Sequence, residues 1–308
     1  MILFWIISGI CFVAAVILTI SYICFRMAFF VNRKKEIKGF TLPDGDIYKP
    51  HSDTMRGWAE EVENMPYEQF FITSFDGLKL SGKYYEYSKD APIELMFHGY
   101  RGSAERDLCG GVQRCFKLGR NALLVDQRGI GSSEGNVITF GISERKDCLK
   151  WVDFMIDHFG PRVKIIICGI SMGASTVLMA SGEELPPNVI GVLADCGYNS
   201  AKDIIKSVID KMGLPKNLAY PFVKLGARIY GHFDLEETTP EEALKKCKIP
   251  VIFFHGDTDD FVPCEMSEKN YDACVSKKKL VKIKGAGHGL SYIIDPDLYL
   301  NSLKEFFA

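Results

Sequence analysis

The sequence has no marked excess of charge of either sign. Its 37 lysines and arginines nearly balance 39 aspartates and glutamates, which leaves a formal net charge of −2. Proteins that bind nucleic acid usually present a concentrated basic surface, whereas the basic run Lys277-Lys278-Lys279 is more typical of a solvated turn. The sequence therefore predicts no nucleic-acid partner.

Metal and nucleotide motifs are also missing. The ten cysteines are scattered, and no C-x-x-C pair or comparable metal-ligand spacing occurs. Gly129-x-Gly131 lacks the third glycine of a dinucleotide site, and there is no G-x-x-x-x-G-K-[ST] phosphate loop. We therefore predict no metal and no other cofactor. Scattered cysteines are expected to be reduced and structural, as in cytoplasmic domains.

The first 25 residues contain no charged side chain. As a helix they would span about 37 Å, more than the ~30 Å core of a bilayer. A cleaved signal peptide would have a basic start, a shorter apolar stretch and a small-residue cleavage site, and this segment matches all three poorly. We therefore predict one transmembrane helix within residues 1–31, in the cell membrane. The first basic cluster, Arg33-Lys34-Lys35 with Arg26 and Lys38, follows this helix and places the remainder of the chain in the cytoplasm.

Gly169-Ile170-Ser171-Met172-Gly173 lies between an apolar run and a segment of small residues that is expected to be helical. A strand, a G-x-S-x-G turn and a helix form a nucleophile elbow. Such a turn holds its serine in a strained backbone conformation, and its glycines avoid collisions where strand and helix approach closely. Ser171 is therefore the candidate nucleophile.

A serine hydroxyl is a poor nucleophile until a base takes its proton, so a histidine and an acid are expected later in the chain. Three of the six histidines precede the elbow. His232 lies in a polar, irregular stretch, and His255 ends an apolar strand. His288 remains, in the glycine-rich loop Gly285-Ala286-Gly287-His288-Gly289, which can bring an imidazole close to a serine. His288 is the candidate base.

The candidate acid lies in the segment 251–263, where Asp257, Asp259 and Asp260 follow an apolar strand. The residues alone do not choose among these three. The pattern His255-Gly-x-x-Asp-x-x-Val-Pro263 resembles one found in the α/β-hydrolase superfamily, whose acid occupies the position that matches Asp259. Because some members place the acid one strand earlier, Asp195 is the alternative. The resemblance covers residues 67–307 and is to the esterase and serine aminopeptidase-like branch.

Two further loops carry the same resemblance. His98-Gly99-Tyr100-Arg101-Gly102 resembles the oxyanion loop, which implies the backbone N–H of Tyr100 as one oxyanion donor. The second donor is the N–H of Met172, the residue after the nucleophile. The side chain of Tyr100 is then expected to be free to line the substrate pocket. The segment 126–135 matches the D-x-R-G-x-G-x-S-x-G loop, whose role in the superfamily is mostly structural.

Apolar runs predict eight strands, at residues 68–73, 78–87, 93–97, 121–125, 163–168, 189–194, 250–255 and 279–283. Helical patterns lie between most of the later strands. Such alternation implies an α/β domain with a mostly parallel sheet covered on both faces, in agreement with the α/β-hydrolase fold. We expect this domain over residues 67–308 and a linker or tether over 32–66.

Residues 201–246 are too many for a simple connection between strands. In the superfamily an insertion here acts as a helical lid over the serine, and Pro215, Pro221 and Gly226 are expected to break it into short pieces.

Together these features predict a membrane-anchored serine hydrolase. It would cleave a carboxylic ester or thioester of a small to medium acyl group, from a small molecule or a lipid, through a Ser-His-Asp triad and an acyl-enzyme. A serine peptidase, an amidase or a protein deacylase is the alternative within the same chemistry. A non-catalytic binding protein on a hydrolase fold is the alternative of another class.

Overall fold

An eight-stranded sheet forms the centre of the molecule. In this computed structural model, which describes residues 1–32, 41, 43 and 45–308, the strands are ordered β1-β2-β4-β3-β5-β6-β7-β8. β2 pairs antiparallel with β1 and with β4, and all other neighbours are parallel. The predicted mostly parallel sheet is therefore confirmed, with a mixed edge. Its strands are β1 (Glu68–Thr73), β2 (Lys79–Tyr85), β3 (Ile93–Phe97), β4 (Asn121–Asp126), β5 (Ile165–Ile170), β6 (Val189–Asp195), β7 (Val251–Gly256) and β8 (Lys278–Ile283).

Helices cover both faces of the sheet, because its central strands are apolar on both sides. In β5, Ile165 and Ile167 face one hydrophobic cluster, whereas Ile166 and Cys168 face another. The first cluster is closed by α5 (Glu144–Phe159), α6 (Met172–Ala180), α9 (Pro240–Leu244) and α10 (Cys264–Ala273). The second is closed by α2 (Ser52–Asn64), α3 (Ala104–Asp107), α4 (Cys109–Lys117), α11 (Ser291–Ile294) and α12 (Pro296–Phe306).

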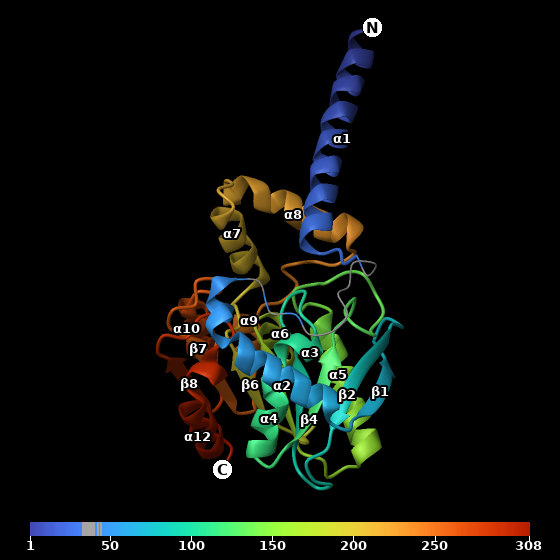
Figure 1. Cartoon of the computed structure of the whole chain (residues 1–308). Helices are drawn as coiled ribbons and strands as arrows, with labels where there is room; N and C mark the ends of the chain where they lie inside the picture. Colours follow the sequence, from blue (N-terminus) through green and yellow to red (C-terminus); the bar gives the residue numbers. More distant parts are fainter. Residues whose placement is uncertain (33–40, 42, 44) are drawn as a thin grey trace.

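α1 (Ile2–Ala28) projects away from this body (Figure 1). It is long and apolar enough to cross a membrane, with a mean hydropathy of 2.6 over its most apolar window. Only its C-terminal end packs against the domain. The basic residues 33–35 and 38, on which the predicted orientation depends, lie outside the described residues.

α7 (Ala201–Lys211) and α8 (Lys216–Tyr230) follow β6 and pack against each other, and α8 also packs against α1. The expectation that Pro221 and Gly226 break this segment is wrong, since α8 runs through both. Pro221 is exposed, so water can bond the carbonyl that it leaves without a partner. Gly226 faces α1, and a Cβ there would lie 2.4 Å from the carbonyl oxygen of Ser21.

We expect Gly226→Ala to lower the free energy of unfolding by about 1–3 kcal/mol, because the added methyl group collides with the α1 backbone. Gly57→Ala is the matched control in α2, where a Cβ meets nothing within 4 Å. That change should raise stability by about 0.5–1 kcal/mol, the usual gain of alanine over glycine in a helix. Thermal unfolding of the full chain in detergent measures both. Equal gains in the two variants would mean that α1 and α8 are not in contact at Gly226.

Candidate active site

The turn after β5 is tightly constrained by its neighbours. Ser171 has φ 55° and ψ −117°, and α6 begins at the next residue. A Cβ on Gly173 would lie 2.0 Å from the carbonyl oxygen of Phe97, and one on Gly169 would lie 2.1 Å from the carbonyl carbon of Gly173. Only glycine fits at these two positions, so the strand, turn and helix have the form of a nucleophile elbow.

The structure brings Ser171, His288 and Asp259 together from three loops at the carboxyl edge of the sheet. His288 Nε2 lies 2.9 Å from Ser171 Oγ, and His288 Nδ1 lies 2.7 Å from Asp259 Oδ2. Ser171 and Asp259 are buried, whereas His288 is partly exposed. Since the carboxylate accepts from Nδ1–H, the Nε2 atom is left as the acceptor for the serine proton.

Asp259 is bonded on all sides. Its Oδ1 accepts from the N–H groups of Phe261 and Val262, both at 2.9 Å. A second imidazole, His255, places Nε2 3.3 Å from Oδ2. Burial alone would raise the pKa of Asp259, but hydrogen bonds from His255 and His288 outweigh it and hold the pKa well below its usual range. The sequence placed His255 at the end of a strand and in the motif that contains Asp259, but it gave no indication that the two side chains are in contact.

The other candidate acids have different partners. Asp195 is buried and accepts from Ser291 Oγ at 2.7 Å and from Tyr299 OH at 3.1 Å. Asp257 accepts from the N–H of Gly285 at 2.6 Å, and Asp260 is exposed. Of the four aspartates, only Asp259 bonds the His288 ring.

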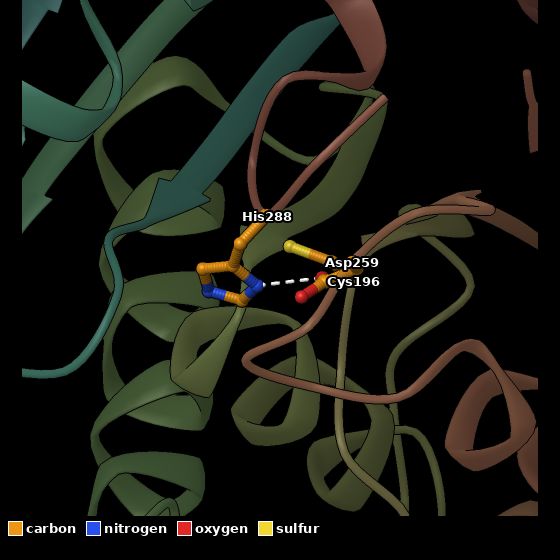
Figure 2. Close-up of side chains that lie close together, drawn as sticks. All are labelled: Cys196, Asp259 and His288. Carbon is orange, nitrogen blue, oxygen red and sulfur yellow. Dashed lines mark hydrogen bonds and ion pairs between the residues drawn. The ribbon is translucent and has the colours of Figure 1, made fainter. Parts of the chain in front are cut away.

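Cys196 lies beside this pair, and sequence reasoning missed it. Figure 2 shows its sulfur next to Asp259 and His288, and the ligand atoms of the three residues lie within 4.8 Å of one another. Thiolate, imidazole and carboxylate are zinc ligand types. However, burial and the neighbouring Asp195 and Asp259 charges raise the pKa of the thiol well above its ordinary value, and Asp259 is already fully bonded. We interpret Cys196 as a neutral side chain that packs beneath the pair.

The loop after β3 is held from two sides. His98 is buried, its Nδ1 donates to the carbonyl of Gly99 at 2.8 Å, and its Nε2 accepts from the N–H of Gln127 at 3.0 Å. Asp107 accepts from the N–H of Gly99 at 3.0 Å. Among the described residues, the N–H groups of Tyr100 and Met172 have no acceptor.

The loop after β4 is tied to the domain through Arg128. Its guanidinium pairs with Asp147 of α5 at 2.8 Å and with Asp76 at 3.0 Å. These ion pairs join the loop to β1–β2 and to α5, and none of them reaches the Ser171 hydroxyl. The arrangement agrees with a structural role for this segment.

No family model matches the sequence. It is similar to the protein YqkD of Bacillus subtilis (strain 168), at 26% identity over 292 residues, which cover 94% of this chain and 92% of YqkD. The solved esterase Pf2001 of Pyrococcus furiosus has a TM-score of 0.65 at 22% identity, over 88% of this chain and 97% of that one. The α/β hydrolase GrgF from Penicillium sp. sh18 has a TM-score of 0.62 at 18% identity, over 79% of this chain and 98% of that one. This chain has the α/β-hydrolase fold.

Within this fold, the loop after β3 is bonded to the end of α1. Tyr100 OH donates to the carbonyl of Ala28 at 2.7 Å, so its side chain lines the cavity as expected but is not free. Arg101 Nη2 donates to the carbonyls of Met27 at 2.8 Å and Phe30 at 3.1 Å. The last carbonyls of a helix have no partners within the helix, and these two side chains bond the last two of α1, those of Met27 and Ala28.

A cavity of about 640 Å³ lies over Ser171 and His288. Tyr100, Arg101 and Phe261 form part of its wall. Residues 201–246, expected as a lid, contribute none of the residues that line it. Within this segment, α7 packs on α8 and α8 packs on α1 instead.

The segment before α2 completes the cavity wall. η2 (Asp46–His51) carries Ile47 and Tyr48 into the lining. Tyr48 OH donates to the carbonyl of His288 at 3.0 Å. Trp58 of α2 packs so closely on α4 that a Cβ on Gly110 would lie 2.7 Å from its ring. These contacts fix the segment to the domain. The sequence predicts a tether here, but it does not indicate that the tether lies beside His288.

We expect Arg101→Gln to speed amide hydrogen exchange in residues 98–103 by about tenfold or more, because hydrogen bonds from a charged donor contribute about 1.5–3 kcal/mol. Exchange of the full chain in detergent, followed by mass spectrometry, measures the effect. Arg56→Gln, which changes an exposed arginine of α2, should leave these residues unaffected. Unchanged exchange in Arg101→Gln would show that the loop is ordered without α1.

Proposed function

We propose that this chain is a membrane-anchored serine hydrolase that cleaves a carboxylic ester or thioester of a small to medium acyl group. The observation that carries the proposal is the chain of hydrogen bonds from Ser171 through His288 to Asp259 at the base of a cavity. The two N–H groups without acceptors, those of Tyr100 and Met172, lie in the loop and helix start next to the serine. The structural similarity to the Pyrococcus furiosus esterase Pf2001 also favours an ester.

In the proposed mechanism, Ser171 Oγ attacks the substrate carbonyl carbon while His288 Nε2 accepts its proton. Asp259 remains ionised and stabilises the imidazolium through Nδ1–H. The oxyanion accepts hydrogen bonds from the N–H groups of Tyr100 and Met172, each worth about 3 kcal/mol. His288 then donates its proton to the leaving group, and water attacks the acyl-enzyme by the same route.

The volume and the lining of the cavity favour a substrate of modest size. Its volume of about 640 Å³ falls within the ~300–1,000 Å³ that small-molecule sites usually have. Ile47, Ile170 and Phe261 offer apolar surface to an acyl group. The charged part of the lining is mixed in sign, because Arg101 and Arg106 are accompanied by Asp46, Asp107 and Asp260. An apolar acyl group with a polar leaving group fits this distribution.

We expect a fluorophosphonate to add once to the full chain and not to Ser171→Ala, because the reagent requires an activated serine but no knowledge of the substrate. Intact-mass analysis measures the adduct. The full chain in detergent is the sample, since removal of residues 1–31 would delete the buried Phe25 and Phe29. Ser132→Ala, which changes an exposed serine, should keep the adduct. A folded parent that does not react would favour the non-catalytic alternative.

We expect Asp259→Asn to lower kcat by about 10³–10⁴, because the amide cannot hold the imidazole in the required tautomer. Asp260→Asn should change kcat by less than about threefold, since an exposed carboxylate outside the hydrogen-bonded chain supplies little transition-state stabilisation. Kinetics on a short-chain ester compares the two variants, with thermal unfolding as a check on folding. Similar losses in both would remove Asp259 from its proposed role.

A further inference from the structure

The anchor helix is built into the domain. Phe25 is 5% exposed and Phe29 is fully buried, with the Phe29 ring 5.6 Å from that of Phe140 and 5.2 Å from that of Phe233. Phe30 then forms a β-bridge with Val137. Together with the hydrogen bonds from Tyr100 and Arg101, these contacts fix the direction in which α1 leaves the domain.

α8 crosses α1 where α1 enters the domain. Figure 1 shows α8 lying across the foot of α1, with the sheet on one side of it and the projecting length of α1 on the other. Gly226 brings the two backbones together at Ser21. One turn further along α8, Tyr230 OH donates to the carbonyl of Leu18 at 3.1 Å, and its ring lies 5.1 Å from that of Tyr22.

α8 has two apolar faces. Tyr220, Val223 and Ala227 are buried on the domain. The opposite stripe carries Leu218, Phe222, Leu225 and Ile229, at spacings of four, three and four residues that place them on one side of a helix. Leu218 is 70% exposed and Ile229 is 38% exposed. The turn between α7 and α8 adds the exposed Met212 and Leu214.

The length of α1 indicates at which depth of the bilayer the outward face of α8 would lie. The part of α1 before the crossing, residues 2–20, is about 28 Å long as a helix, close to the ~30 Å hydrocarbon core of a bilayer. If that part fills the core, then the core ends at Ser21, where α8 crosses. The stripe of α8 faces away from the domain, because it lies on the side of the helix opposite the buried residues.

We propose that the outward face of α8 and the α7–α8 turn lie in the interfacial layer of the bilayer that α1 enters. The apolar stripe would reach the acyl-chain boundary, as in interfacial amphipathic helices. Arg26, in the last turn of α1, and Arg228 of α8 are both exposed and would meet the lipid head groups. α1 and α8 thus form one continuous membrane-binding surface. Tyr100 and Arg101 line the cavity and also bond the last carbonyls of α1. If the proposed hydrolase function holds, its cavity therefore lies beside the lipid head groups.

Tryptophan quenching in nanodiscs tests this surface. Leu218→Trp and, separately, Leu214→Trp are made in the full chain, which is placed in phosphatidylcholine nanodiscs with or without lipids brominated near the top of the acyl chains. Val275→Trp is the matched control, because Val275 is 67% exposed and lies just before the start of β8. It is therefore at the edge of the sheet where the parallel strands begin, whereas α7 and α8 follow the carboxyl end of β6. The parent chain, with its own three tryptophans, is subtracted.

We expect bromolipid to quench about half or more of the emission added at residues 218 and 214, and about a tenth or less of that added at residue 275, since interfacial helices bury their apolar face ~5–10 Å deep. Quenching at both positions no greater than at residue 275 would overturn the proposal. So would blue-shifted but unquenched emission, which would place a second protein surface over the stripe. Because the readout needs no turnover, its failure would leave the proposed hydrolase activity unaffected, and an inactive chain could still pass this test.

Discussion

The close approach of α6 to β3 is the constraint on which the rest of the site depends. Only a glycine at position 173 lets the helix begin against the carbonyl oxygen of Phe97, which would lie 2.0 Å from any Cβ there. This contact turns Ser171 out of the sheet at φ 55° and places the Met172 N–H beside the loop that follows β3. A larger residue at position 173 would push the start of α6 away from that loop. The N–H groups of Met172 and Tyr100 would then move apart.

A buried carboxylate is costly unless its oxygens are bonded. Asp259 meets this requirement with two backbone N–H groups and two imidazoles. The same bonds join the segment after β7 to the loop after β8, and they keep the carboxylate ionised. One set of contacts therefore orders two loops and orients His288 toward the serine. The charge of Asp259 also explains why the adjacent Cys196 is a neutral thiol, since a second negative charge there would be repelled.

α1 and the domain are one structural unit. The sequence predicts an anchor followed by a linker, and the apolar length of α1 agrees with the first part of that description. The buried Phe29 and the hydrogen bonds from Tyr100 and Arg101 add a rigid junction. Because the loop after β3 is bonded to the foot of the helix, the position of the helix and the shape of the cavity wall are coupled.

By itself the sequence determined the α/β architecture and the order in which Ser171, Asp259 and His288 occur, because strand periodicity, glycine turns and short motifs are local signals. The tertiary structure decided which candidate acid meets His288, since Asp257, Asp259 and Asp260 lie in one short segment and only one of them is directed inward. It also decided the partner of Tyr48, which is 240 residues away in the chain, and that of Tyr100, which is 72 residues away. Burial patterns in a sequence indicate that a side chain is covered, but contacts between distant segments depend on how whole elements pack together.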